Sequence, residues 1–249
     1  MHFGPPSASR RVSFVLALAC AVVTSACAGR GVFKPEYEYE EELYLALDGS
    51  ATVNVNASVA SLVALRGAEL DPDPRARVDR ERVRAFFGAP DARVTVSLAR
   101  RRGRRFVHAS VGLDDIRMLS RIPAFAWSAY ELDRREDGVE FRQRIGPPVE
   151  RHAPADAWTG EEIVAFRMHL PSEIVAHNAP SGTIERGNIL VWEQALAARL
   201  AATPVDVRVQ FEPTSILART LTLFGLAIAA AAMTIVSLLW WVSRRGRGE

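Results

Sequence analysis

The stretch EYEYEEELYLALDGSATVNVN, residues 36–56, contains the clearest local fold signal in the chain. Apolar residues alternate along residues 43–47 and again along residues 53–55, which is the period of a half-buried strand. Asp48-Gly49 lies between the two runs, and this dipeptide is a preferred two-residue hairpin loop. The stretch therefore predicts an antiparallel β-hairpin.

Acidic residues are concentrated in the first half of this hairpin. We interpret them as a solvated sheet edge, because charges on an exposed edge strand discourage pairing with other molecules. The five glutamates are Glu36, Glu38, Glu40, Glu41 and Glu42.

Short helices and further hairpins are predicted along the following residues. Ser58 is a suitable N-cap for a helix that starts at residue 59, and Gly67 is suited to end it. Alternating runs predict two more hairpins, over residues 92–113 and 124–146. The first of these has an arginine-rich tip.

The second half of this region continues the same pattern. We expect a strand over 161–171, a loop through His177 and Asn178, a tight hairpin over 182–192, a short helix over 195–202 and a last strand over 205–211. Hairpins interspersed with short helices predict an α+β fold with a mostly antiparallel sheet, followed by one C-terminal transmembrane helix.

The transmembrane prediction is based on residues 220–243, which include no charged side chain. A helix of this length reaches roughly 36 Å, whereas the hydrocarbon core of a bilayer is about 30 Å thick. Trp240 and Trp241 lie near its end, at the depth that indole rings favour. Arg244, Arg245 and Arg247 follow and place the C-terminus in the cytoplasm by the positive-inside rule.

The N-terminal segment has the features of an export signal. Arg10 and Arg11 precede a short apolar run, and small residues follow that run. Two processing sites compete. Residues 26–28, Ala-Cys-Ala, fit cleavage after Ala28, whereas residues 24–27 resemble a lipobox in which Cys27 is lipidated as the new N-terminus.

These signals divide the chain into four predicted parts. They are an export signal peptide of lipoprotein type at 1–27, an extracytoplasmic α+β ectodomain at 28–218, a transmembrane helix at 219–243 and a basic cytoplasmic tail at 244–249. The proline-rich segment 146–160 is a possible boundary within the ectodomain.

Charge and cysteine content narrow the possible functions of the ectodomain. Residues 28–218 hold 25 basic and 28 acidic side chains, so the net charge of +2 for the whole chain comes from its two ends. Nucleic acid is therefore not an expected partner. Both cysteines, Cys20 and Cys27, lie in the signal region, so no disulfide is expected in the ectodomain.

Two groups of residues are candidate binding sites. An arginine cluster at a hairpin tip is suited to anionic lipid headgroups or a phosphorylated glycan, although a solvated tip is the simpler interpretation. It comprises Arg100, Arg101, Arg102, Arg104 and Arg105. A set of apolar residues either lines a lipid groove or fills the core; it comprises Leu62, Val63, Phe86, Phe87, Val107, Phe125 and Trp127.

Catalytic and metal-binding motifs are not found in the sequence. His169 and His177 have a spacing that matches no metal motif, and we see neither a nucleophile elbow nor a phosphate-binding glycine loop. A pair of catalytic carboxylates remains an alternative, because any two of the 28 acidic residues of the ectodomain could lie close together in the fold. We expect a protein that is not an enzyme and that uses no cofactor or metal.

The end of the ectodomain resembles the LppM-type domain of exported, membrane-anchored bacterial proteins. Pro171, Val175, Asn178 and Trp192 match that pattern in order, whereas Ser172 stands where it usually has Gly. The resemblance covers about 45 residues and implies an α/β ectodomain that binds envelope lipids or glycolipids. It supplies no active site, and it implies structural roles for Pro171, Asn178 and Trp192.

The sequence therefore favours a bacterial envelope protein whose ectodomain lies outside the cytoplasm. We expect its partners to be membrane lipids, and envelope proteins if the ectodomain instead serves in interaction or assembly. An uncharacterised hydrolase is a third alternative.

Overall fold

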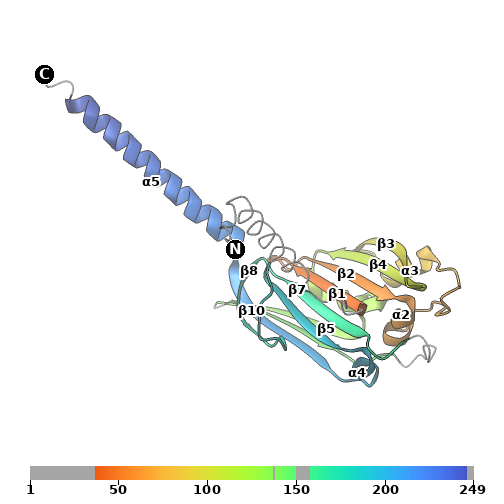
Figure 1. The fold of residues 1–249 in the computed structure, drawn as a ribbon. Coiled ribbons are helices and arrows are strands. Elements are labelled where there is room, and N and C mark those ends of the chain that lie inside the picture. The colour runs from red at the N-terminus through yellow and green to blue at the C-terminus, as the bar shows by residue number, and fades with distance from the viewer. Residues whose placement is uncertain (1–36, 137, 150–157, 246–249) are drawn as a thin grey trace, which may run out of the picture. The chain divides into compact units, whose positions relative to one another are not determined.

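The computed structural model describes residues 37–136, 138–149 and 158–245, to which every structural statement below refers. Strands from these residues form one sheet of six strands and one sheet of four (Figure 1). Most neighbouring strands are antiparallel, and short helices connect some of them. The fold is thus α+β, as the alternation of hairpins and short helices predicts.

The six-stranded sheet is built around the predicted N-terminal hairpin. Its strands lie in the order β3 (Arg93–Arg101), β4 (Arg104–Leu113), β2 (Ala51–Ser58), β1 (Tyr37–Leu45), β7 (Ile163–His169) and β9 (Ile189–Ala195). The pairing of β1 with β7 is parallel, and the other pairs in this sheet are antiparallel.

The four-stranded sheet contains the predicted third hairpin and the last strand. Its order is β5 (Ser128–Arg135), β6 (Gly138–Ile145), β10 (Val205–Ser215) and β8 (Ser172–His177), with antiparallel pairing throughout. Strands from both sides of segment 146–160 occur in each sheet, so this segment connects parts of one compact unit.

Five short helices and one long one complete the described chain. They are α2 (Val59–Arg66), α3 (Arg80–Phe86), the 3-10 helices η1 (Ile116–Arg121) and η2 (Pro123–Phe125), α4 (Leu196–Leu200) and α5 (Ile216–Arg245). The predicted caps of α2 are confirmed. Ser58 accepts a hydrogen bond from the Ser61 backbone N–H, and Gly67 ends the helix at a φ of 65°.

One hydrophobic core holds side chains from both sheets. Alternate residues of β1 and β2 point into it, among them Leu43, Leu45, Val53 and Val55. The predicted hairpin is therefore correct, but its loop is longer than two residues. Leu45 pairs with Ala51, so residues 46–50 form the turn.

The prediction that the glutamates of β1 form a solvated edge is wrong. β1 lies inside the sheet between β2 and β7, and both Glu38 and Glu41 are at most 2% exposed. Each is compensated by a cation, since Glu38 pairs with Arg104 and Glu41 with Arg66. Glu38 also accepts a 3.0 Å hydrogen bond from the indole N–H of Trp158.

Glu41 is the centre of a polar cluster between the two sheets, which we call the Glu41 cluster. One carboxylate oxygen contacts Arg66 Nη2 at 2.7 Å and accepts a hydrogen bond from the Tyr39 hydroxyl at 2.7 Å. The other oxygen accepts hydrogen bonds from Gln143 Nε2 at 2.9 Å and the Tyr130 hydroxyl at 3.4 Å. All five side chains are buried.

Strand β8 is a second departure from the sequence prediction, which places a loop there. Its side chains do not alternate between apolar-buried and polar-exposed, and Val175 is 60% exposed. Among the described strands, β8 pairs only with β10 and lies at the edge of its sheet, so its sequence carries little of the usual strand signal. In the predicted hairpin over 182–192, β9 is the regular strand, and Glu185 makes an isolated bridge to Ile189.

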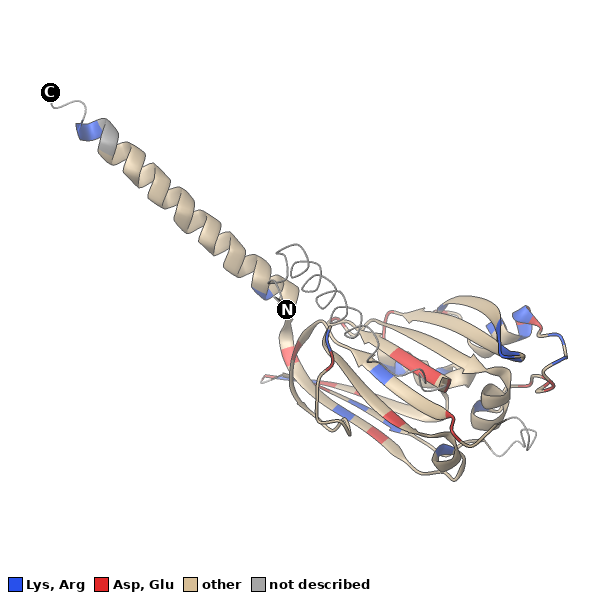
Figure 2. Ribbon diagram, in the orientation of Figure 1, with Lys and Arg blue, Asp and Glu red and all other residues tan. Residues whose placement is uncertain are grey.

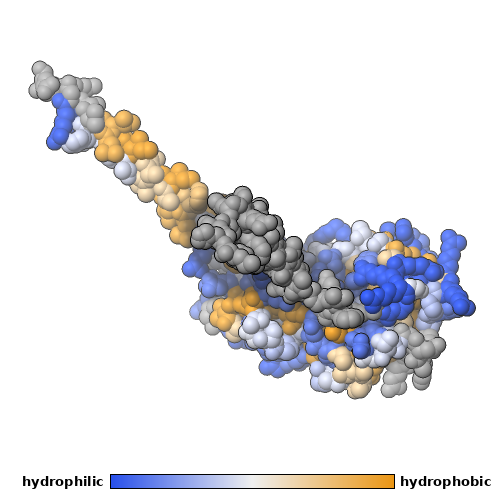
Figure 3. Space-filling model, in the orientation of Figure 1, coloured by the Kyte–Doolittle hydropathy of each residue, from blue (hydrophilic) through white to orange (hydrophobic). Residues whose placement is uncertain are grey.

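The long helix α5 follows β10 without a break and carries no charged side chain between Arg219 and Arg244 (Figure 2). Its large apolar residues are exposed, from Leu217 to Trp241 (Figure 3). Residues 216–241 are long and apolar enough to cross a membrane. This agrees with the length and composition expected of a transmembrane helix.

Candidate functional site

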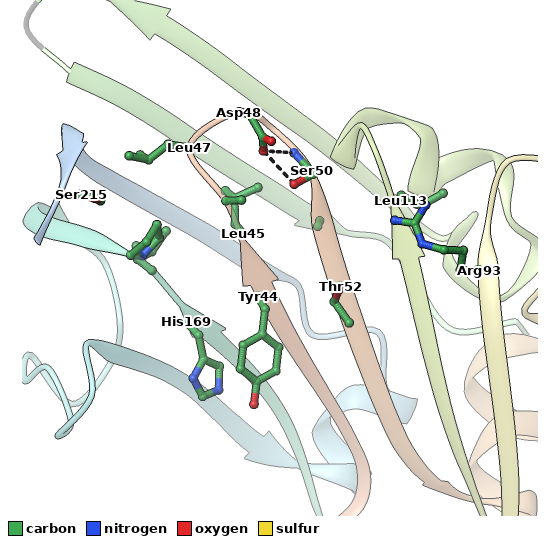
Figure 4. Close-up of a pocket in the computed structure, with 14 residues that line it drawn as sticks. Tyr44, Leu45, Leu47, Asp48, Ser50, Thr52, Arg93, Leu113, His169 and Ser215 are labelled. Carbon is green, nitrogen blue, oxygen red and sulfur yellow. Dashed lines mark hydrogen bonds between the residues drawn. The ribbon is translucent and has the colours of Figure 1, made fainter. Parts of the chain in front are cut away.

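A groove of about 760 Å³ opens at the end of the six-stranded sheet where β7 ends and β3 begins (Figure 4). Its volume lies within the usual 300–1,000 Å³ of small-molecule sites. Of the fourteen described residues that line it, seven are aliphatic or proline. The lining consists of residues 44–48 and 50–52, Arg93, Leu113, residues 169–171 and Ser215.

The groove lies beside the start of α5, so we call it the α5-end groove. Ser215, one of its lining residues, is the last residue of β10, and its hydroxyl accepts a 3.0 Å hydrogen bond from Ala218 N–H. The carbonyl of Pro171, another lining residue, accepts a 2.9 Å hydrogen bond from Ile216 N–H. Arg219 joins this end of α5 to β8 through a 3.2 Å ion pair with Glu173.

The β1–β2 turn forms one wall of the groove and is held by local hydrogen bonds. Asp48 Oδ1 accepts hydrogen bonds from Ser50 N–H at 2.9 Å and from the Ser50 hydroxyl at 2.7 Å. These hydrogen bonds are the main reason that the pKa of Asp48 is lowered. Gly49 has a φ of +96°, which favours glycine, and Arg134 donates a hydrogen bond to the Leu47 carbonyl.

An aromatic pair lies on the solvent face next to this turn. The rings of Tyr44 and His169 are stacked, with centroids 4.0 Å apart and planes 14° apart. Desolvation lowers the pKa of His169, and Arg167 lowers it further, while Glu42 acts in the opposite direction. His169 Nε2 is buried and has no hydrogen-bond partner among the described residues. The imidazole is therefore expected to be neutral at pH 7.

We predict that the cover provided by Tyr44 is what keeps the pKa of His169 below 6.5, its ordinary value. Tyr44→Ala should raise this pKa towards 6.5, since water then reaches the ring. Tyr44→Phe retains the ring and should leave the pKa unchanged. An NMR titration of the imidazole measures both variants. A His169 pKa at or above 6.5 in the unaltered protein would contradict the prediction.

The lowered pKa of His169 makes the folding stability depend on pH. Because the folded-state pKa of His169 is lowered, the unfolded chain binds the proton more readily. The stabilisation from the neutral ring is thus present above pH 6.5 and is lost as the pH falls through the folded-state pKa.

The apolar residues predicted to line a lipid groove do not line the α5-end groove. Leu62, Val63, Phe87, Val107 and Phe125 are buried in the core, and Phe86 and Trp127 are half-buried beside it. Their side chains fill the space between the elements, as the simpler interpretation of these residues expects.

The predicted arginine cluster is divided by the structure. Arg100, Arg101 and Arg102 are exposed at the β3–β4 tip. Arg104 pairs with buried Glu38, and Arg105 is itself buried. Binding of anionic headgroups by the whole cluster stays a prediction, but only part of the cluster faces solvent.

Other predicted sites have separate positions. Cys27 lies outside the described residues. His169 belongs to β7 of the six-stranded sheet, whereas His177 ends β8 in the other sheet, where its Nδ1 accepts a hydrogen bond from Ala179 N–H at 3.2 Å. Within residues 37–136, 138–149 and 158–245, no group of three or more His, Cys, Asp or Glu side chains is arranged to hold a metal ion.

The residues singled out by the resemblance have structural contacts. Asn178 Oδ1 accepts hydrogen bonds from the Trp192 indole at 3.2 Å and from Arg208 N–H at 2.8 Å. Trp192 is 5% exposed and belongs to the core. These contacts join β9 to β10 through the end of β8, so Asn178 and Trp192 hold the two sheets together.

Comparisons with known proteins include a distant structural likeness. Neither a protein-family model nor a curated protein sequence matches the chain. Among solved structures, it is similar to the folded domain of the LppM protein of Mycobacterium tuberculosis, determined by NMR, at 14% sequence identity and a TM-score of 0.37. The likeness covers 74% of this chain and 96% of that domain. At these values it assigns neither a family nor a function.

Proposed function

We propose that this protein is a membrane-anchored envelope protein that binds an envelope lipid or glycolipid in the α5-end groove. The observation that carries the proposal is the position of this groove. An apolar-lined cavity of about 760 Å³ lies where the sheets lead into a helix that is long enough to span a bilayer. A lipid of the same membrane would thus be close to the groove.

The composition of α5 supports the membrane part of the proposal. Apolar side chains are exposed all around this helix, a pattern that in water is unfavourable and in a bilayer is expected. Its last turns pair tryptophans with arginines: Arg244 lies 4.3 Å from the Trp240 ring and Arg245 lies 3.8 Å from the Trp241 ring. Such residues suit the cytoplasmic interface, with the ectodomain on the other side.

The lining of the groove suits a lipid with a polar head. Leu47 and Ala46 are half-buried on the turn and leave apolar surface at the groove. Arg93 is exposed at the edge, where its guanidinium contacts Asp114 at 3.1 Å. An acyl chain would contact the aliphatic residues, and a headgroup would meet Arg93 and the Tyr44 hydroxyl.

We propose binding without catalysis at this groove. Asp48 is engaged by the turn that it stabilises, and the ring of His169 is covered by Tyr44. A general acid–base pair needs two titratable groups that reach the same substrate atom. Asp48 instead stabilises the β1–β2 turn through its hydrogen bonds with Ser50.

Leu47→Asp is predicted to abolish lipid retention, because it places a charge in the apolar part of the groove. The full chain is extracted in a mild uncharged detergent and examined by native mass spectrometry for lipid adducts. Dioleoyl-phosphatidylglycerol is then added as a defined probe. The unaltered chain should carry adducts of lipid mass, and Leu47→Asp should lose them by about tenfold or more.

Val149→Asp is the matched control, because Val149 is also an apolar residue, is 43% exposed and does not line the groove. It should retain the adducts. A clean mass for the unaltered chain, with no shift after the probe is added, would contradict the lipid proposal and favour an assembly role. Equal losses in both variants would contradict the assignment to this groove.

A further inference from the structure

A second groove, of about 880 Å³, lies at the other end of β3 and β4. We call it the distal groove. The loop before α3 forms one side, and the end of β3 with the start of β4 forms the other. Among the described residues, its lining includes the apolar Val78 and Leu98, four arginines and one acidic residue, Asp79.

Three of these arginines are exposed and have no ion-pair partner in the described part of the chain. They are Arg77, Arg80 and Arg100. Asp79 is the N-cap of α3 and accepts hydrogen bonds from Glu81 N–H at 2.9 Å and from Arg82 N–H at 3.3 Å. Its carboxylate is therefore already engaged by backbone donors.

The fourth arginine, Arg105, gives the distal groove a fixed shape. It is 6% exposed, its Nη1 donates to the Ala76 carbonyl at 2.7 Å, and its Nη2 donates to the Asp71 carbonyl. Its Nε is buried and has no acceptor within the described residues. Burial lowers the pKa of Arg105, and so does the nearby charge of Arg100, whereas Asp71 and Asp73 raise it.

The distal groove is separated from the α5-end groove by most of a strand. Arg93 at the start of β3 lines the α5-end groove, and Arg100 near its end lines the distal groove. At about 3.3 Å per residue, these positions are roughly 23 Å apart. A lipid headgroup beside Arg93 is therefore too far away to occupy the distal groove as well.

We propose that the distal groove binds the phosphate groups of an anionic envelope polymer that carries a phosphate in every repeat unit. This goes beyond the lipid proposal, and it assigns the ligand to Arg77, Arg80 and Arg100 instead of the whole predicted tip. A phosphate group has enough oxygens to accept from more than one guanidinium fork. Three exposed arginines with no ion-pair partner among the described residues can therefore contact more than one phosphate of a chain. The fixed loop around Arg105 means that little ordering is needed on binding.

The test uses the full chain in uncharged detergent micelles and a fluorescently labelled long-chain polyphosphate as the probe. Binding is followed by anisotropy at several salt concentrations. Arg77→Gln/Arg100→Gln should weaken binding by about tenfold or more and should lower the slope of log K against log salt by about two. Arg121→Gln/Arg186→Gln removes the same charge from exposed arginines elsewhere and should weaken binding less than about twofold.

Each arm of the experiment has a result that would overturn the proposal. Equal losses in the two double variants would show that net charge alone attracts the probe. If polyglutamate binds as tightly as polyphosphate, the groove does not prefer phosphate over carboxylate. Displacement of the probe by glycerophosphoglycerol at equal phosphate concentration would indicate a single lipid headgroup instead of a polymer. Leu47→Asp alters the α5-end groove and should leave polyphosphate binding unchanged. The two proposals can therefore fail independently of each other.

Discussion

Replacing Glu41 by glutamine is expected to lower the free energy of unfolding by about 3–5 kcal/mol. The substitution keeps the shape of the side chain but removes the charge that compensates Arg66. Their side chains are 3% and 1% exposed, so water cannot replace the lost partner without opening the core. Breaking a buried ion pair on one side is costly because the other charge stays buried alone.

The measurement is urea unfolding of the full chain in micelles, followed by tryptophan fluorescence. Trp127 is a suitable reporter because the Arg66 guanidinium lies over its ring. Glu42→Gln is the matched control, since Glu42 is the next residue on β1 and faces the other side of the sheet. The control should change stability by less than about 0.5 kcal/mol. A loss of less than about 1 kcal/mol for Glu41→Gln would contradict the prediction.

A double variant separates the charge from the rest of the Glu41 cluster. Glu41→Leu/Arg66→Met removes both charges and keeps apolar volume, so it should recover much of the stability lost in Glu41→Leu alone. The recovery would be incomplete, because Gln143 and Tyr130 would lose the carboxylate that accepts their hydrogen bonds. If the double variant is no more stable than Glu41→Leu, the loss of stability comes from these hydrogen bonds and not from the ion pair.

The sequence predicted the local elements well where the signal lies in neighbouring residues. The alternation on either side of Asp48-Gly49 identified the β1–β2 hairpin, and Ser58 and Gly67 identified both ends of α2. Each of these signals depends on backbone geometry within a few residues. Distant parts of the chain do not change them.

The glutamates of β1 show where such reasoning fails. Their composition indicates an edge strand, but β1 is covered on one side by β7, which follows it by more than a hundred residues. A parallel neighbour at that distance leaves no local mark on the sequence. The cations that allow burial of Glu38 and Glu41 come from β4 and α2, so the pairs exist only after the sheets have formed.

The α5-end groove was not predictable for a related reason. Its lining comes from the ends of β3, β4, β7 and β10 together with the β1–β2 turn. The apolar residues that the sequence predicts for a lipid groove instead fill the core or pack beside it. One usable signal was Tyr44, an aromatic residue at an outward position of β1, which is 41% exposed.

The second large effect is expected in α5. Leu226→Arg/Ala230→Arg places two charges on one face near the middle of residues 216–241. Each arginine costs about 2.5–3.5 kcal/mol at the centre of a transmembrane helix, and neither is near an end from which it could reach the headgroups. We therefore expect α5 to fail to insert and the protein to leave the membrane fraction.

The experiment needs a chain whose only proposed anchor is α5, because a lipidated Cys27 would hold the protein at the membrane by itself. Residues 1–28 are thus exchanged for an export signal that is cleaved without lipidation, and resistance to alkaline carbonate is measured. Leu226→Ala/Ala230→Leu is the matched control: it keeps the composition of the helix and should remain in the membrane. If the double arginine variant is retained as well as this control, α5 does not anchor the protein, and the lipid proposal loses the proximity on which it depends.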